Sequence, residues 1–141
     1  ILCETGLLPG ALLHNNNQKF ICKNVNLSVQ TNGALITNKM KVDQNILIPI
    51  AHGEGRYYAD AATLSELNKN DQVMFKYCDS KGKVTDASNP NGSLENIAGI
   101  CNVGRNVFGM MPHPERASDI ELSNTDGLQL FESILTEVSV A

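Results

Sequence analysis

Short strand-like segments dominate this chain and helical segments are few, which limits the folds open to it. Strand-like runs of apolar residues occur at 19–30, 46–51 and 73–78, with a weaker run at 34–37. Two more, at 97–102 and 106–111, flank a short turn and predict a hairpin. Helical spacing of apolar residues appears over 61–69 and 126–135. The mixture predicts an α/β or α+β fold in which strands outnumber helices.

The ends of the chain and its polar turns complete this prediction. Residues 1–5 are read as the tail of a helix that Gly6 ends. The closing helix is expected to bury one stripe, formed by Leu128, Phe131, Ile134 and Leu135. The N-P-N-G-S stretch at 89–93 is read either as a docking loop or as an exposed turn.

Composition indicates a water-soluble globular chain. With 141 residues, 42% of them apolar and 18% charged, residues 1–141 are expected to form a single domain or a large part of one. The net charge of −4 and the lack of a basic run argue against a nucleic-acid partner. No apolar run has the length to cross a membrane. The apolar opening lacks a basic start and carries Glu4 and Pro9, so we predict no signal peptide and a cytoplasmic location.

Four cysteines are scattered singly through the sequence. Because no two of them form a C-x-x-C pair, neither a zinc knuckle nor a thioredoxin-type site is indicated. We expect each thiol to behave as a small buried hydrophobic group; they are Cys3, Cys22, Cys78 and Cys101.

The stretch G-M-M-P-H-P-E-R at 109–116 places an imidazole and a carboxylate two residues apart, with proline between them. Proline favours extended backbone in the residue before it, and side chains at i and i+2 of an extended segment leave the same face. Glu115 is therefore expected to reach His113 and hold its tautomer, as an orienting carboxylate does for a general base. A surface loop with a satisfied ion pair is the alternative interpretation.

The residues raise two other possible chemistries. A second His-x-Glu pair, His52 and Glu54, could join His113 and Glu115 in a metal site, although nothing in the sequence shows that the pairs converge. A nucleophilic triad would need a cysteine or serine on a G-x-C-x-G or G-x-S-x-G turn, and the chain contains neither motif.

Four stretches, taken together and in order, carry a resemblance to a known family. The runs M-M-P-H-P-E-R-A, I-P-I-A-H-G-E-G, N-P-N-G-S and G-L-L-P-G-A-L-L resemble the glutamine amidotransferase subunit of phosphoribosylformylglycinamidine synthase. The likeness runs from near residue 1 to about residue 135 and is closer to the small, separate-subunit form than to the large single-chain form. It implies the C-terminal part of a class I amidotransferase domain, a flavodoxin-like doubly wound sheet with added antiparallel strands.

The resemblance implies a function in purine biosynthesis. A cysteine thiolate would attack the side-chain amide of glutamine, giving a thioester and ammonia, and water would then release glutamate. In that pattern His113 is the base and Glu115 its partner. The ammonia passes to a synthetase subunit that uses ATP and Mg²⁺, so this chain would need no cofactor of its own. A small accessory subunit would complete the complex.

The resemblance also implies which residues lie near glutamine. The chain differs from the family pattern in that the nucleophile is not among its residues. Family members line the glutamine site near the positions of Phe20, Cys22 and Lys23. The nucleophile would stand upstream of residue 1, so we expect the 141-residue chain alone not to hydrolyse glutamine. A non-catalytic module that docks on a synthetase and a metallohydrolase remain as alternatives.

Overall fold

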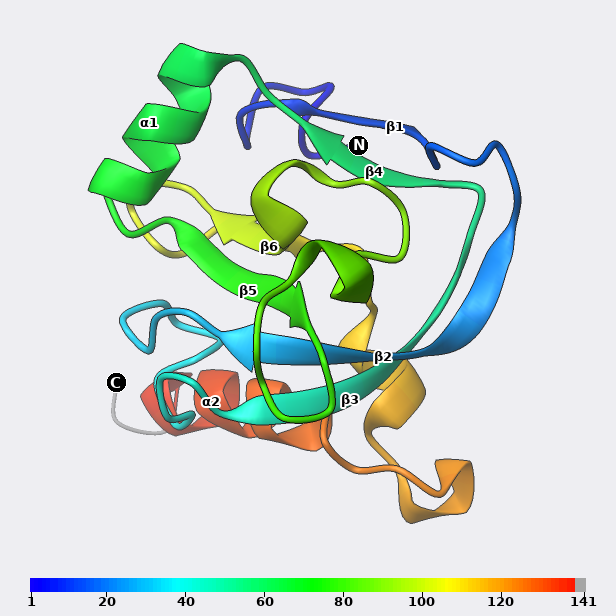
Figure 1. The fold of residues 1–141 in the computed structure, drawn as a ribbon. Helices are drawn as coiled ribbons and strands as arrows, with labels where there is room; N and C mark the ends of the chain where they lie inside the picture. The colour runs from blue at the N-terminus through cyan, green and yellow to red at the C-terminus, as the bar shows by residue number, and fades with distance from the viewer. Residues whose placement is uncertain (139–141) are drawn as a thin grey trace.

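The computed structural model describes the backbone of residues 1–138 and the side chains of residues 1–136 (Figure 1). Five strands form one antiparallel sheet in the order β3-β2-β5-β6-β7. Their bounds are Ile21–Val29 for β2, Asn45–His52 for β3, Val73–Cys78 for β5, Ile97–Cys101 for β6 and Phe108–Met110 for β7. A second, two-stranded antiparallel sheet pairs β1 (Ala11–His14) with β4 (Glu54–Tyr58).

Two α-helices and four short 3₁₀ helices complete the described elements. They are α1 (Ala61–Lys69), α2 (Leu128–Val138), η1 (Asp86–Ser88), η2 (Leu94–Asn96), η3 (Pro114–Ala117) and η4 (Ile120–Leu122). The start of α1 is fixed locally, because the side chain of Asp60 accepts a hydrogen bond from Thr63 N at 2.7 Å.

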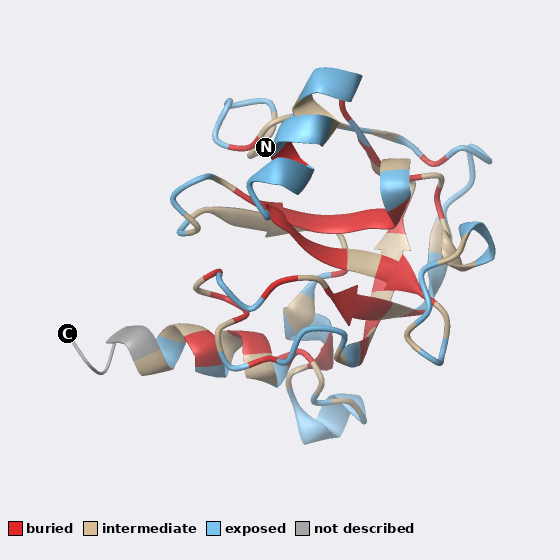
Figure 2. Ribbon diagram, turned by 60° about the vertical axis from the view of Figure 1, so that its left-hand side comes forward, coloured by how far each residue is buried: buried red, intermediate tan, exposed pale blue. Residues whose placement is uncertain are grey.

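Both faces of the five-stranded sheet are covered (Figure 2). One core lies between the sheet, the 34–40 segment and α2, and it includes Leu27, Ile48 and Phe75 from the sheet and Leu130 from the helix. The other lies on the side of β4 and α1 and includes Tyr57, Leu67 and Ile100. Strands that are buried on both faces need not alternate strictly, which explains the loose alternation of the β2 sequence.

The mixed α/β class and most of the elements expected from sequence are confirmed. The 61–69 helix, the 73–78 strand and the hairpin of β6 and β7 occur where predicted. Every strand pair among the described residues is antiparallel, so the parallel pairs expected of a doubly wound sheet do not occur among them. Residues 1–5 form one turn, closed by Thr5 N donating to Ile1 O at 2.9 Å, and Gly6 follows with φ of +75°.

Two predictions of local structure are wrong, and one pair of strands was missed. The 34–37 segment is not a strand, because Thr37 N bonds back to Ala34 O and Met40 N to Thr37 O in successive turns. Strands β1 and β4 were not predicted at all. The stripe of α2 is rotated from the expected one, since Leu130 and Ser133 are fully buried while Leu135 is 63% exposed.

The N-P-N-G-S stretch is not an exposed turn, since Asn91 is fully buried. Its Nδ2 donates to Gly55 O at 2.8 Å on β4 and to the Tyr77 hydroxyl at 3.4 Å on β5. Its Oδ1 accepts from both the backbone N and the hydroxyl of Ser93. One amide therefore joins the two sheets.

We predict that Asn91→Ala lowers the free energy of unfolding by at least about 2 kcal/mol, because the Gly55 carbonyl and Ser93 would lose their buried partner. Asn32→Ala, at an exposed position, is the matched control and should change it by less than about 0.5 kcal/mol. Urea unfolding of both variants gives the comparison. Equal stabilities would show that the Asn91 amide does not hold the sheets together.

Candidate active site

Both histidines of the His-x-Glu pairs lie at one end of the five-stranded sheet. Strand β3 ends at His52, which pairs with Ile21 at the start of β2. Strand β7 ends at Met110 at the same end of the sheet, and the chain continues through Met111 to His113. Although β3 and β7 occupy opposite edges, the sheet curls, and η3 packs against β3.

His113 is held by its backbone and by one carbonyl. It is the N-cap residue of η3, with Pro114 in the first turn. Its Nδ1 lies 2.5 Å from Met111 O. Because a carbonyl only accepts, Nδ1 carries the proton, and Nε2 keeps a lone pair that can take a proton from a substrate or nucleophile.

The direct contact expected between Glu115 and His113 is not made among the described side chains, and the orienting role of Glu115 stays a prediction. Extended geometry ends at His113, whose φ and ψ are −82° and 121°, and Pro114 starts a 3₁₀ helix, so Glu115 does not continue the extended segment. Among the described side chains, no hydrogen bond or ion pair joins the two residues. The Met111 carbonyl fixes the tautomer instead.

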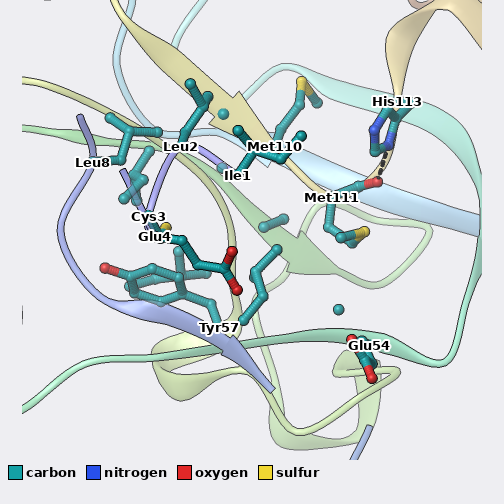
Figure 3. A pocket seen from close by; sticks show the side chains of 17 residues that line it. Ile1, Leu2, Cys3, Glu4, Leu8, Glu54, Tyr57, Met110, Met111 and His113 are labelled. Atoms are coloured by element: carbon teal, nitrogen blue, oxygen red, sulfur yellow. Dashed lines mark hydrogen bonds between the residues drawn. The ribbon is translucent and has the colours of Figure 1, made fainter. Parts of the chain in front are cut away.

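His113 lines two cavities. The larger, of about 420 Å³, has an apolar wall that includes Leu8, Ile100 and Met110, and Glu54 stands at its polar side (Figure 3). The smaller, of about 230 Å³, is lined by residues from β3 and from 111–116: Pro49, Ala51, His52, Met111, His113, Glu115 and Arg116. His113, Glu115 and His52 are thus brought to one cavity, whereas Glu54 lies on the other.

His52 is buried and its tautomer is fixed by Asn15. The Asn15 Nδ2 donates to Lys19 O at 2.8 Å and to His52 O at 2.9 Å, which orients its Oδ1 towards His52 Nδ1 at 3.1 Å. Nδ1 therefore donates, and Nε2 is a buried acceptor to which no described protein group donates. The ring lies against Gly55, where a Cβ atom would overlap it.

Burial is the main cause that lowers the pKa of His52 below its ordinary value, and the neighbouring His113 ring adds to this. The cavity thus holds one imidazole kept neutral, His52, and one exposed imidazole whose Nε2 is free to act as a base, His113. In the sequence, the only signal for a role of His52 beside His113 is its motif, H-G-E-G, in which glycines flank the glutamate.

The four thiols do not all follow the expectation of burial. Cys78 and Cys101 are buried and Cys3 is partly buried, but Cys22 is exposed near the start of β2. Burial raises the pKa of Cys3 and of Cys101, and raises that of Cys78 to about 11. Cys3 lines the larger cavity on the side opposite His113, next to Leu2 and Leu8 (Figure 3), and its thiol donates to Pro9 O at 3.7 Å.

The residues expected near glutamine lie at the correct end of the sheet but outside both cavities. Phe20, Cys22 and Lys23 are exposed, and Cys22 pairs with Ala51 of β3, which lines the smaller cavity. Their contact with glutamine stays a prediction.

The second His-x-Glu pair is not assembled as a metal site. Glu54 pairs with His14 Nε2 at 3.1 Å across the small sheet, and both side chains are exposed. Within the described residues there is no group of three or more potential metal ligands. No helix in this part of the chain has the length and apolar character needed to span a membrane.

Comparison with known proteins defines the class. Residues 1–131 match the CobB/CobQ-like glutamine amidotransferase domain family, and the chain belongs to this family. Among curated proteins it is similar to the phosphoribosylformylglycinamidine synthase subunit PurQ of Koribacter versatilis, with 56% identity over 135 residues, 96% of this chain and 58% of the relative. The corresponding subunit of Acaryochloris marina is 54% identical over 138 residues, 98% of this chain and 59% of the relative.

A solved structure gives the same result. A chain in the structure of PurLQS from Thermotoga maritima superimposes with a TM-score of 0.81 at 42% identity, covering 97% of this chain and 57% of that one. The chain therefore spans somewhat under three fifths of the length of these relatives.

We predict that Gly55→Ala lowers the free energy of unfolding by about 1–3 kcal/mol, since its methyl group would force His52 or β4 to move. Gly53→Ala is a matched control, because nothing lies within 4 Å of a Cβ there. Chemical denaturation measures both, and the imidazole resonances of His52 should shift only in Gly55→Ala. Equal effects of the two substitutions would contradict the close packing of the ring.

The stability of the chain should fall as the pH is lowered below about 6.5, the ordinary pKa of histidine. The folded state depresses the pKa of His52, so the unfolded state binds its proton first and is favoured as the pH drops. We expect His52→Gln, which lacks this group, to have a smaller loss of stability between pH 7.5 and 5.5. Identical pH slopes for the two proteins, measured by urea unfolding, would contradict this prediction.

Proposed function

We propose that this chain is part of the glutaminase component of a phosphoribosylformylglycinamidine synthase, and that His113 is the base of its active site. The observation that carries the proposal is the state of His113. It lies in a chain of the glutamine amidotransferase family, its Nδ1 proton is held by Met111 O, and its Nε2 is free beside two cavities. Glutamine hydrolysis through a thioester needs a base that takes a proton from the thiol and then gives it to the departing ammonia.

The proposed reaction proceeds through a thioester. His113 Nε2 takes the proton of a cysteine thiol, and the thiolate attacks the side-chain amide carbon of glutamine. The same proton passes to the leaving nitrogen as the C–N bond breaks and ammonia departs. Water, deprotonated by His113, then cleaves the thioester, which releases glutamate and returns the thiol.

The nucleophile in this proposal lies outside residues 1–141, as the resemblance to the family implies. Cys3, Cys78 and Cys101 have pKa values raised by burial, which is the reverse of what a thiolate nucleophile requires. Cys22 is exposed and lines neither cavity. Glu115 is assigned to orient His113 once the active site is complete, and Phe20, Cys22 and Lys23 to line the glutamine site.

The partners follow from the same proposal. The ammonia would pass to a synthetase subunit that consumes ATP with Mg²⁺, and a small accessory subunit would join the complex in the cytoplasm. The similar chain from T. maritima belongs to a structure named PurLQS, and this name supports a complex of three kinds of subunit.

The test is a chimera in which the part of the K. versatilis relative that this chain does not match is joined to residues 1–141. We expect it to release glutamate from glutamine, and His113→Ala to lower kcat by roughly 10²–10⁴-fold. Glu115→Gln should lower kcat with a smaller change in KM. His14→Gln, at an exposed histidine outside both cavities, is the matched control and should retain full activity.

Two outcomes would contradict the proposal. Full activity of the His113→Ala chimera would show that another group is the base. Binding of the chimera to the synthetase without any glutamate release would favour the non-catalytic docking module instead.

A further inference from the structure

The 117–127 loop, which follows η3, is closed at its base. Gly127 N donates to Ala117 O at 2.7 Å, so the two ends of the loop meet. A Cβ atom on Gly127 would overlap the Pro114 carbonyl, and the close approach therefore requires glycine. Compact surface loops whose ends are joined in this way are frequently functional.

The 117–127 loop is also anchored to the edge of the five-stranded sheet. Asn124 Nδ2 donates to Leu47 O at 2.6 Å, and Leu47 N donates to Asp126 Oδ2 at 2.8 Å. These two bonds satisfy the outward-facing backbone groups of Leu47 on the edge strand β3, which would otherwise be open to pairing with another chain. The contacts that anchor the loop to the rest of the chain are thus made by residues at its base.

The tip of the loop carries two apolar side chains that take no part in this anchoring. Ile120 is 79% exposed and Leu122 is 53% exposed, and both belong to η4. The tip is nevertheless ordered by its own bonds: Glu121 N donates to Asp119 Oδ1 at 2.9 Å, and Leu122 N donates to Asp119 O at 3.0 Å. In Figures 1 and 2 this loop projects from the body of the molecule.

The charge beside the tip indicates what can cover it. Asp119 and Glu121 alternate with Ile120 and Leu122, and the whole chain carries a net charge of −4. A complementary surface has an apolar pocket with lysine or arginine at its rim. Because the tip is already fixed, little conformational entropy is lost when it docks.

We propose that Ile120 and Leu122 form the apolar contact through which this chain docks on the synthetase subunit, in an apolar pocket with a basic rim. The assignment of that partner rests on the proposed function. The position of the loop favours it, since the loop begins in the same short segment as His113, and a subunit that receives ammonia must bind close to the base.

The test is calorimetric titration of this chain with the synthetase and small accessory subunits encoded in the same genome, with glutamine left out. We expect Ile120→Asp/Leu122→Asp to weaken binding by roughly 10–100-fold. The apolar replacement Ile120→Met/Leu122→Met should stay within about threefold of the parent chain. Val103→Asp, at a turn residue that is 74% exposed, is the matched control and should bind as the parent does.

The charged rim has its own test. Glu121→Lys should weaken binding at low salt, and the difference from the parent should shrink at high salt because the charges are then screened. Since all the substituted side chains are exposed, the thermal unfolding midpoints of the variants should match that of the parent.

Binding of the Asp variant as tight as that of the parent would overturn the proposal. So would a parent chain that does not bind, because the 117–127 loop is complete in it. Neither result bears on the glutaminase proposal, which is measured by glutamate release without the synthetase. Conversely, an inactive chimera that still binds through Ile120 and Leu122 would leave the docking surface standing.

Discussion

The side chain of Asn91 is the interaction on which the arrangement of the two sheets depends. It spans from the Gly55 carbonyl on β4 to the Tyr77 hydroxyl on β5, and its backbone carbonyl accepts from Asn16 N at 3.0 Å after β1. A hydrophobic contact would hold the sheets together but would not fix their relative position. A fully buried amide with directed bonds does, because each misplaced partner would cost about 1–3 kcal/mol.

The position of β4 then determines the surroundings of His52. Gly55 lies between Asn91, which binds its carbonyl, and the His52 ring, which packs on its Cα. Asn15, next to the other Asn91 contact, fixes the His52 tautomer. The network of asparagines therefore continues into the candidate active site, where it fixes the tautomer of the His52 imidazole beside the proposed base. The N-P-N-G-S and H-G-E-G stretches are thus in direct contact through Asn91 and Gly55.

Sequence patterns predicted the elements that local chemistry decides. The apolar spacing of the 61–69 helix and the turn of the β6–β7 hairpin lie within the local sequence, so both could be predicted. Strands β1 and β4 could not, because they are short and are stabilised by pairing with each other and by the buried amide of Asn91. The 34–37 segment failed for a related reason: its apolar side chains do enter the core, but from turns.

The sequence indicated His113 and Glu115 as candidate site residues but not the geometry around them. The prolines around His113 predicted extended backbone, and this holds at His113; Pro114 is also a favoured first residue of a helix, and η3 begins there. The convergence of His52 and His113 on one cavity depends on the curl of the sheet, which joins residues far apart in the chain. No pattern along the sequence indicates that His52 and His113 lie near each other.

The segment 111–127 must satisfy two structural conditions, and Gly127 allows both to be met. The start of the segment must hold His113 at the mouth of two cavities, and its end must begin α2 at the depth where Leu130 enters the core. Both conditions are met only if the chain returns against the Pro114 carbonyl, which Gly127 alone permits. The loop between them is then free to project, which is why apolar residues can stand at its tip without loosening the site at its base.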